Sequence, residues 1–132
     1  MPQAMATEIQ NQCEIIEDCY EFTLSFAARG VSTDEGSGLR ERLTSSVEAI
    51  RSLVRNGADV AREQQPAPAE RCEAFFAVLR RDAETALAAM ELVLTAPVIS
   101  SQLVDTLNAS IHLRALLADL FLLTEILESP KK

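Results

Sequence analysis

The chain has 132 residues and a mass of 14.4 kDa, and its hydrophobic content of 48% fits one globular domain with a core of its own. Its net charge of −8 opposes unspecific binding to nucleic acid or to an anionic membrane. Few glycines and prolines, no tryptophan and weak strand signals predict an all-α fold with an aliphatic core.

The first predicted helix spans residues 5–29 and stops before Gly30, a residue suited to a left-handed C-terminal cap. An apolar seam with helical spacing begins at Ile9, Cys13 and Ile16, and a second seam lies beside it. The remaining face is acidic and carries Glu14, Glu17, Asp18 and Glu21. This helix is therefore broad in its apolar surface.

The second predicted helix spans residues 38–63, with Leu39 and Leu43 on its core side and arginines on the other. The following segment QQPAPA ends it, because two prolines cannot continue a helix. The third predicted helix spans residues 69–95 and has an alanine-rich core stripe. The fourth spans residues 101–128, with a serine at its start as the cap.

These elements predict a single domain over residues 1–132, folded as an antiparallel up-down-up-down four-helix bundle. Each helix would be roughly 37 Å long at 1.5 Å per residue, and the connections between helices are short. No internal repeat or low-complexity segment competes with this interpretation.

The stretch of residues 113–127 is apolar on nearly every side of a helix. A surface helix of a monomer needs only one apolar stripe, roughly 100° wide, so this helix must be covered on several sides. We therefore expect the bundle to associate with copies of itself through its first and last helices. The contacts expected between subunits are Phe22, Phe26, Leu116, Leu120, Leu123 and Leu127.

The three cysteines, Cys13, Cys19 and Cys72, leave at least one thiol unpaired and show no zinc-binding spacing. Buried free thiols predict a reducing, cytoplasmic location. The first residues lack the charged and apolar regions of a secretion signal. Residues 113–127 carry three charges and are too short to span a bilayer, which needs about 20 residues.

Four arginines form the one candidate binding site, at Arg51, Arg55, Arg80 and Arg81. If the second and third helices are antiparallel about QQPAPA, Arg51 and Arg80 lie at the same height. Repeated around an oligomer, the four would form a positive belt for phosphate or an acidic partner segment. The alternative is ordinary surface arginines paired with glutamates such as Glu84.

Catalytic and metal chemistry have weaker signals. The acidic face of the first helix offers carboxylates, but a di-metal bundle normally adds Glu-x-x-His motifs, and the lone His112 has no such partner. We interpret that face as solvated, or as a partner for the arginine belt of a neighbouring subunit. No serine lies in a nucleophile elbow. We therefore expect no enzyme activity, no metal and no cofactor.

The order of these pieces resembles the four-helix-bundle family of proteins encoded in 23S ribosomal RNA intervening sequences. That family includes accessory proteins of diversity-generating retroelements. The best match is GLRERLTSSVEAIRSLVRNG, through Gly38, Leu39, Leu43, Ile50, Val54 and Gly57. The start of the third helix adds Glu73, Phe75, Phe76 and Leu79. The resemblance implies a ring-shaped homopentamer.

The function we expect is therefore a non-enzymatic homo-oligomeric assembly or scaffold that displays or gathers an unidentified protein partner. The alternative is an accessory protein that binds nucleic acid or a ribonucleoprotein through the arginine belt, as the retroelement members imply. Those members are basic, whereas this chain is acidic and has few lysines. A small enzyme or metal carrier is a third alternative, opposed by the lone histidine and the cysteine spacing.

Overall fold

The computed structural model describes residues 2–57 and 69–128, and it places side chains at 8–56 and 73–126. These residues are helical throughout apart from short connections, and they contain no strand. The prediction of an all-α fold is confirmed. The helices are α1 (Pro2–Ala28), α2 (Leu39–Ser52), the π-helical turn η1 (Leu53–Gly57), α4 (Ala69–Leu94), α5 (Ser101–Ala109) and α6 (His112–Glu128).

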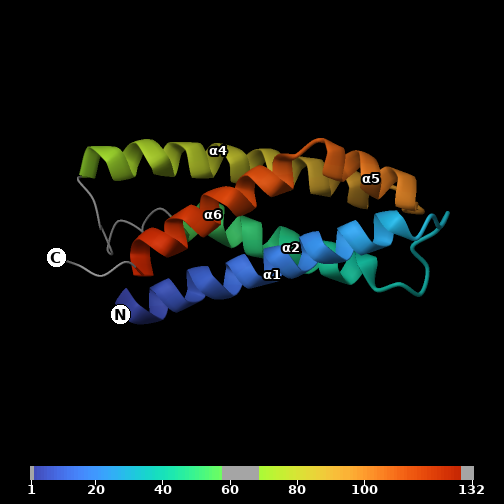
Figure 1. Cartoon of the computed structure of the whole chain (residues 1–132), viewed down its shortest axis with the longest axis horizontal. Coiled ribbons are helices and arrows are strands. Elements are labelled where there is room, and N and C mark those ends of the chain that lie inside the picture. Colours follow the sequence, from blue (N-terminus) through green and yellow to red (C-terminus); the bar gives the residue numbers. More distant parts are fainter. Residues whose placement is uncertain (1, 58–68, 129–132) are drawn as a thin grey trace.

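The helices lie along one long axis and form an elongated bundle (Figure 1). Helix α1 runs away from the end of the molecule that holds the N-terminus, and α2 returns toward it. Helix α4 runs outward again, and α5 and α6 lead back. Helix α1 packs against α2, α5 and α6, whereas α4 packs against α2, η1, α5 and α6. Helices α1 and α4 thus lie across the bundle from each other, each beside α2 and α6.

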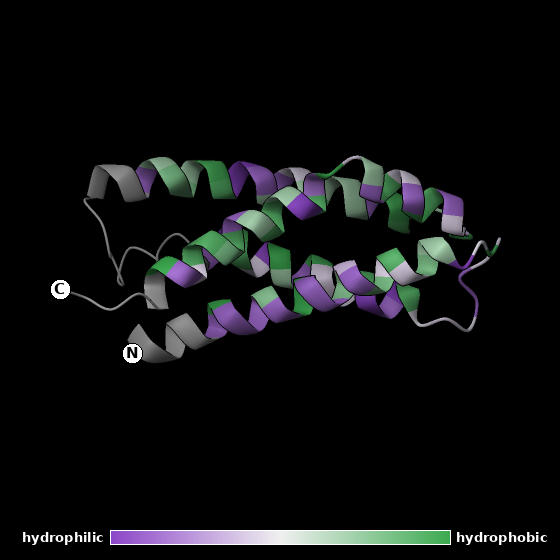
Figure 2. Cartoon of the chain, in the orientation of Figure 1, coloured by the Kyte–Doolittle hydropathy of each residue, from purple (hydrophilic) through white to green (hydrophobic). Residues whose placement is uncertain are grey.

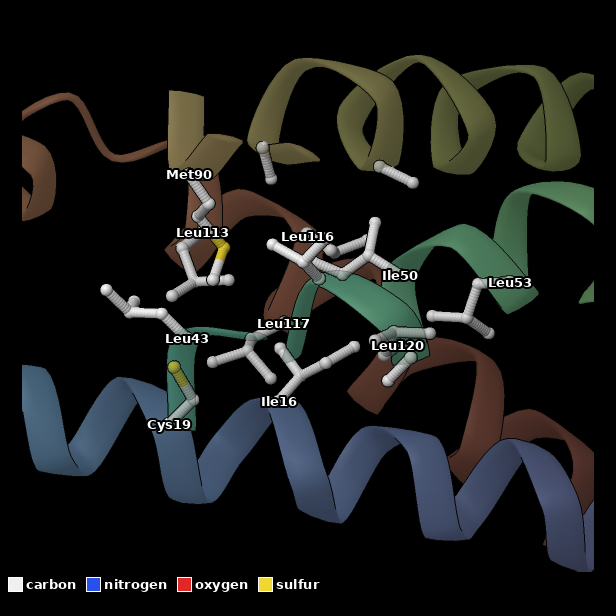
Figure 3. Packing of buried hydrophobic residues seen from close by; sticks show 14 of the residues in the cluster. Ile16, Cys19, Leu43, Ile50, Leu53, Met90, Leu113, Leu116, Leu117 and Leu120 are labelled. Atoms are coloured by element: carbon white, nitrogen blue, oxygen red, sulfur yellow. The ribbon is translucent and has the colours of Figure 1, made fainter. Parts of the chain in front are cut away.

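Aliphatic side chains from the different helices pack together in one continuous core (Figure 3). Ile16 of α1, Ile50 of α2 and Leu116 of α6 are fully buried within it, as are Met90 and Leu120. Burial of one such side chain stabilises the fold by about 1.5–3 kcal/mol. The helices pack together because their apolar residues recur every three or four positions and so form one face. The aliphatic core predicted from composition is confirmed among the described residues.

Polar and apolar surfaces are distributed unevenly (Figure 2). Hydrophobic residues cover much of α6, whereas the side of α1 seen in this view is mostly hydrophilic. Over the described residues, no helix combines the length and the apolar character that a membrane crossing requires.

One pair of side chains ties together two loops at the end of the bundle opposite the N-terminus. The Ile99 amide donates to Asp34 Oδ1 over 2.8 Å, and the Arg40 Nε donates to Asp34 Oδ2 over 2.9 Å. The Arg40 guanidinium also donates to the carbonyl oxygens of Leu94, Ala96 and Pro97. Arg40 therefore satisfies carbonyl groups that the end of α4 leaves open. The Ile99 hydrogen bond is the largest cause of the lowered pKa of Asp34, and Arg40 adds to it.

Ser101 joins the same end of the bundle to α1. Its amide donates to the Val31 carbonyl over 2.8 Å, and its hydroxyl accepts from the Val31 amide over 2.9 Å. The hydroxyl donates in turn to the Phe26 carbonyl over 2.6 Å. Ser100 is the N-cap of α5 and accepts from the Leu103 amide, as the predicted serine cap requires.

The prediction of one continuous helix over residues 101–128 is wrong, because α5 ends at Ala109 and α6 begins at His112. The buried stripe of Val104 and Leu107 would next place Ile111 in the core. Instead Ile111 has a positive φ of 60° and is 61% exposed, and Leu113 is buried. The break rotates α6 relative to α5 so that the leucine-rich side faces the core. No glycine or proline lies at this break to mark it in the sequence.

The other helix boundaries lie close to those predicted. Helix α1 ends at Ala28, and Gly30 has a φ of 64°, as expected for a left-handed residue after a helix. Helix α2 passes into the η1 turn, which ends at Gly57. The predicted continuation of the second helix over residues 58–63 lies outside the described residues.

Candidate interaction surface

The four arginines predicted to form a belt do not form one cluster. Arg51 on α2 makes an ion pair with Glu91 on α4. Arg80 makes an ion pair with Glu84 over 3.4 Å, one turn along its own helix. Arg55 and Arg81 are exposed. The alternative interpretation, surface arginines paired with neighbouring glutamates, therefore describes Arg51 and Arg80.

Arg51 and Arg80 have different ion-pair partners along the bundle, and their equal height stays a prediction. Arg80 lies beside Leu53 and Val54 at the start of η1, which follow Arg51 within one helical turn, around a small cavity of about 20 Å³. Glu91, the partner of Arg51, lies about three turns beyond Arg80 along α4. The contact of η1 with Phe76 and Leu79 means that α4 begins about two turns beyond η1.

Four of the six predicted subunit contacts belong to the core of the single chain. Phe26, Leu116, Leu120 and Leu123 are at most 5% exposed, so they offer no surface to a second copy. The prediction was wrong for these residues because a broad apolar stripe does not reveal which of its edges the neighbouring helices cover. The residues at the centre of the apolar stripe of α6 are buried in the core, and the apolar residues at its edges are exposed.

The other two predicted contacts differ from each other. Phe22 is half-buried, and the Arg42 guanidinium lies 4.3 Å from the centre of its ring, a cation–π contact within one chain. The side chain of Leu127 lies outside the described side chains.

Large apolar side chains nevertheless remain exposed around α6. Leu122 is 53% exposed, and Phe121 and Ile126 lie on the same outer half of the helix. Leu24 of α1 and Val78 of α4 are exposed on the two helices that flank α6. Sequence reasoning identified the surplus apolar surface of the last helix but not these residues. The sequence pattern could have identified these residues, since they lie next to the core positions on the helical wheel.

A groove of about 340 Å³ runs between α1 and α6. Its apolar lining consists of Leu24, Leu117, Ala118 and Phe121. Its polar lining consists of Glu17, Tyr20 and Glu21 of α1 and Arg114 of α6. Each of the two helices contributes about two turns. Apolar side chains flanked by charged ones have the composition of a protein-binding surface.

The acidic face of α1 lies beside this groove. Glu14, Asp18 and Glu21 are exposed, and Glu17 is half-buried. The described part of the chain holds no group of three His, Cys, Asp or Glu side chains arranged to bind a metal ion.

Two carboxyl groups meet on the opposite side of α6, where it packs on α4. Asp119 of α6 and Asp82 of α4 share a side-chain hydrogen bond. Burial raises the pKa of Asp119 to about 7, and the hydrogen bond and negative charge of Asp82 add to the rise. Asp119 Oδ2 is buried and has no hydrogen-bond partner among the described residues. This pair could not be predicted from the sequence, because its members lie on different helices.

The remaining candidate groups are separate from one another. His112 is exposed at the start of α6. Cys13 and Cys19 are free and buried, and burial raises the pKa of each thiol to about 11, so both are protonated near neutral pH. Cys72 lies outside the described side chains.

The α1–α6 groove with its neighbouring exposed apolar side chains is therefore the surface with the clearest binding character. Comparison of the chain with protein-family models, with curated proteins and with solved structures finds no match in any of the three.

Proposed function

We propose that this protein is a non-enzymatic assembly protein that associates with copies of itself through α6 and the groove beside it. The observation that carries the proposal is the exposed apolar side chains left over after the core is complete, above all Phe121, Leu122 and Ile126. Monomeric proteins rarely expose contiguous apolar surface without using it for binding.

We further propose that the subunit is an antiparallel four-helix bundle, with α2 and η1 as its second rod and α5 and α6 as a broken fourth rod. The alternating helix directions in Figure 1 support this assignment. So do the contacts, since α1 and α4 each pack against α2 and α6. This architecture is the one implied by the resemblance to the proteins of 23S ribosomal RNA intervening sequences.

The same resemblance leads us to propose a closed ring, with five subunits as the expected number. The ring would act as a scaffold that gathers a protein partner, without catalysis and without a cofactor. We place it in the cytoplasm, because the free buried thiols Cys13 and Cys19 suit a reducing compartment.

Nucleic-acid binding receives no support from the geometry of the arginines. Arg51 and Arg80 make ion pairs with Glu91 and Glu84, two glutamates that lie about two turns apart along α4. The net charge of −8 opposes a polyanion as well.

The test is the molar mass from light scattering during size exclusion, with absorbance at 260 and 280 nm. We expect an oligomer with a protein-like spectrum from the wild-type chain. Leu122→Glu should reduce the mass at equal concentration, because it places a charge on the proposed interface. Val98→Glu is the matched control: Val98 is 52% exposed but lies in the α4–α5 connection, and its mass should match wild type.

A wild-type monomer at every concentration would refute the proposal. A mass unaffected by Leu122→Glu would refute its choice of surface. Strong absorbance at 260 nm in the oligomer peak would instead favour nucleic-acid binding, since the chain has one tyrosine and no tryptophan to mask it.

A further inference from the structure

The outward side of α4 carries a strip of small and apolar residues where a solvent-facing helix would normally carry charges. Leu92 is 72% exposed and Val78 is exposed as well, and Ala74 and Ala88 lie on the same side. Among the charged residues of this helix, Glu91 pairs with Arg51 of α2, Arg80 lies beside Leu53 and Val54, and Asp82 faces Asp119 of α6. We call this surface the α4 strip; it comprises Ala74, Val78, Arg81, Thr85, Ala88 and Leu92.

The spacing of the α4 strip is that of a helix seam. Its members follow one another at alternating intervals of four and three residues. This is the a/d repeat by which one helix packs along another, and it differs from the scattered exposure of single apolar residues. No other described part of the chain covers the strip, since five of its six residues are exposed and Thr85 is half-buried. The pattern points to a helical partner.

The α1–α6 groove has the shape and charge to receive that strip. Val78, Arg81 and Thr85 span about two turns, the same length that α1 and α6 each contribute to the groove. Arg81 is the one charged member of the strip, and the α1 side of the groove carries Glu17 and Glu21, whereas Arg114 lines the α6 side. Leu24 and Phe121 of the groove are apolar, like most of the strip.

We propose that the α4 strip of one copy of this chain docks into the α1–α6 groove of the next copy, with Arg81 facing Glu17 and Glu21. The proposal rests on the proposed self-association and specifies which surfaces meet. The occupant is a second copy, because the strip and the groove of the same protein match in length, polarity and charge.

The position of the two surfaces makes the contact suitable for a ring. Helices α1 and α4 lie across the bundle from each other, so Arg81 cannot reach Glu17 and Glu21 within one chain. The strip and the groove are different surfaces, so the contact is head-to-tail, and every added copy leaves one strip free at one end and one groove free at the other. Such a contact closes into a ring when the rotation between neighbouring copies divides a full turn.

The test is a charge exchange, measured as molar mass by light scattering over a series of protein concentrations. Arg81→Glu should weaken association at least about tenfold, because it places like charges together. The double variant Glu17→Lys and Glu21→Lys should do the same. The triple variant that combines these changes should regain most of the wild-type association, because every contact is again between opposite charges.

Arg80→Glu and Glu48→Lys are the matched controls. They make the same changes of charge on α4 and α2, outside the strip and the groove, so the mass should match wild type. Circular dichroism would verify that every variant is folded.

An oligomeric wild type whose mass is unchanged in Arg81→Glu, or a triple variant that fails to regain association, would overturn this inference and leave the proposed self-association standing. A closed two-fold dimer would overturn it as well. A wild-type monomer at every concentration would overturn both proposals.

Discussion

The carboxyl pair Asp82–Asp119 makes the stability of the fold depend on pH in a defined direction. The pKa of Asp119 is about 7 in the folded chain, against an ordinary value of 3.8. As pH rises, the unfolded chain therefore releases this proton before the folded chain does. The contribution of Asp119 to stability is fully present below about pH 4 and is lost as pH rises through about 7.

The magnitude follows from the size of that difference. Each pKa unit corresponds to about 1.4 kcal/mol, which sets an upper limit of about 4 kcal/mol on the loss. Asp119 is only partly buried, and solvent screens its interaction with Asp82, so we expect a loss of about 1–2 kcal/mol. Asp119→Asn removes the ionisation and keeps the shape of the side chain. It should therefore become more stable relative to wild type as pH rises from 4 to 8.

The assay is urea unfolding of dilute wild type and Asp119→Asn at pH 4, 6 and 8, followed by circular dichroism. Asp105→Asn, an exposed change on α5, is the matched control and should follow the pH dependence of wild type. A difference between Asp119→Asn and wild type that stays the same at all three pH values would refute the reasoning.

Three further predictions concern stability and use the same unfolding assay. Asp34→Ala should lower the free energy of unfolding by about 2–3 kcal/mol, because it removes the acceptor of the Ile99 amide and of Arg40; a loss below about 0.5 kcal/mol would contradict the role of this pair. At position 111, Ile111→Gly should be about 1 kcal/mol more stable than Ile111→Ala, because only glycine adopts a positive φ without strain; equal stability would argue against the break between α5 and α6. Leu120→Ala should cost about 2–5 kcal/mol and Leu122→Ala less than about 1 kcal/mol, and similar losses would show that α6 is rotated from its described position.

The helices were predictable because apolar spacing and end signals are local. The stripe of Ile9, Cys13 and Ile16 defined the buried side of α1, and Gly30 marked its end. The break at Ile111 was not predictable from local signals. It follows from the docking of α5 against α1 through Ser101 and from the turn that brings Leu113 into the core.

The candidate surface was only partly predictable, because it depends on how helices are arranged around the core. The sequence indicated that α6 has more apolar surface than one side of a helix can bury. It could not show that Leu116 and Leu120 fill the core while Leu122 remains outside. The pairing of Arg51 with Glu91 depends on the register between α2 and α4, which no pattern in either helix specifies.

The measurement that tests self-association most directly is native mass spectrometry of the wild-type chain, recorded over a range of protein concentrations. We expect one closed species, with five chains of 14.4 kDa each as the expected composition, and little signal from intermediate sizes. A spectrum of single chains at every concentration would contradict it, and the exposed apolar side chains around α6 would then require a different partner.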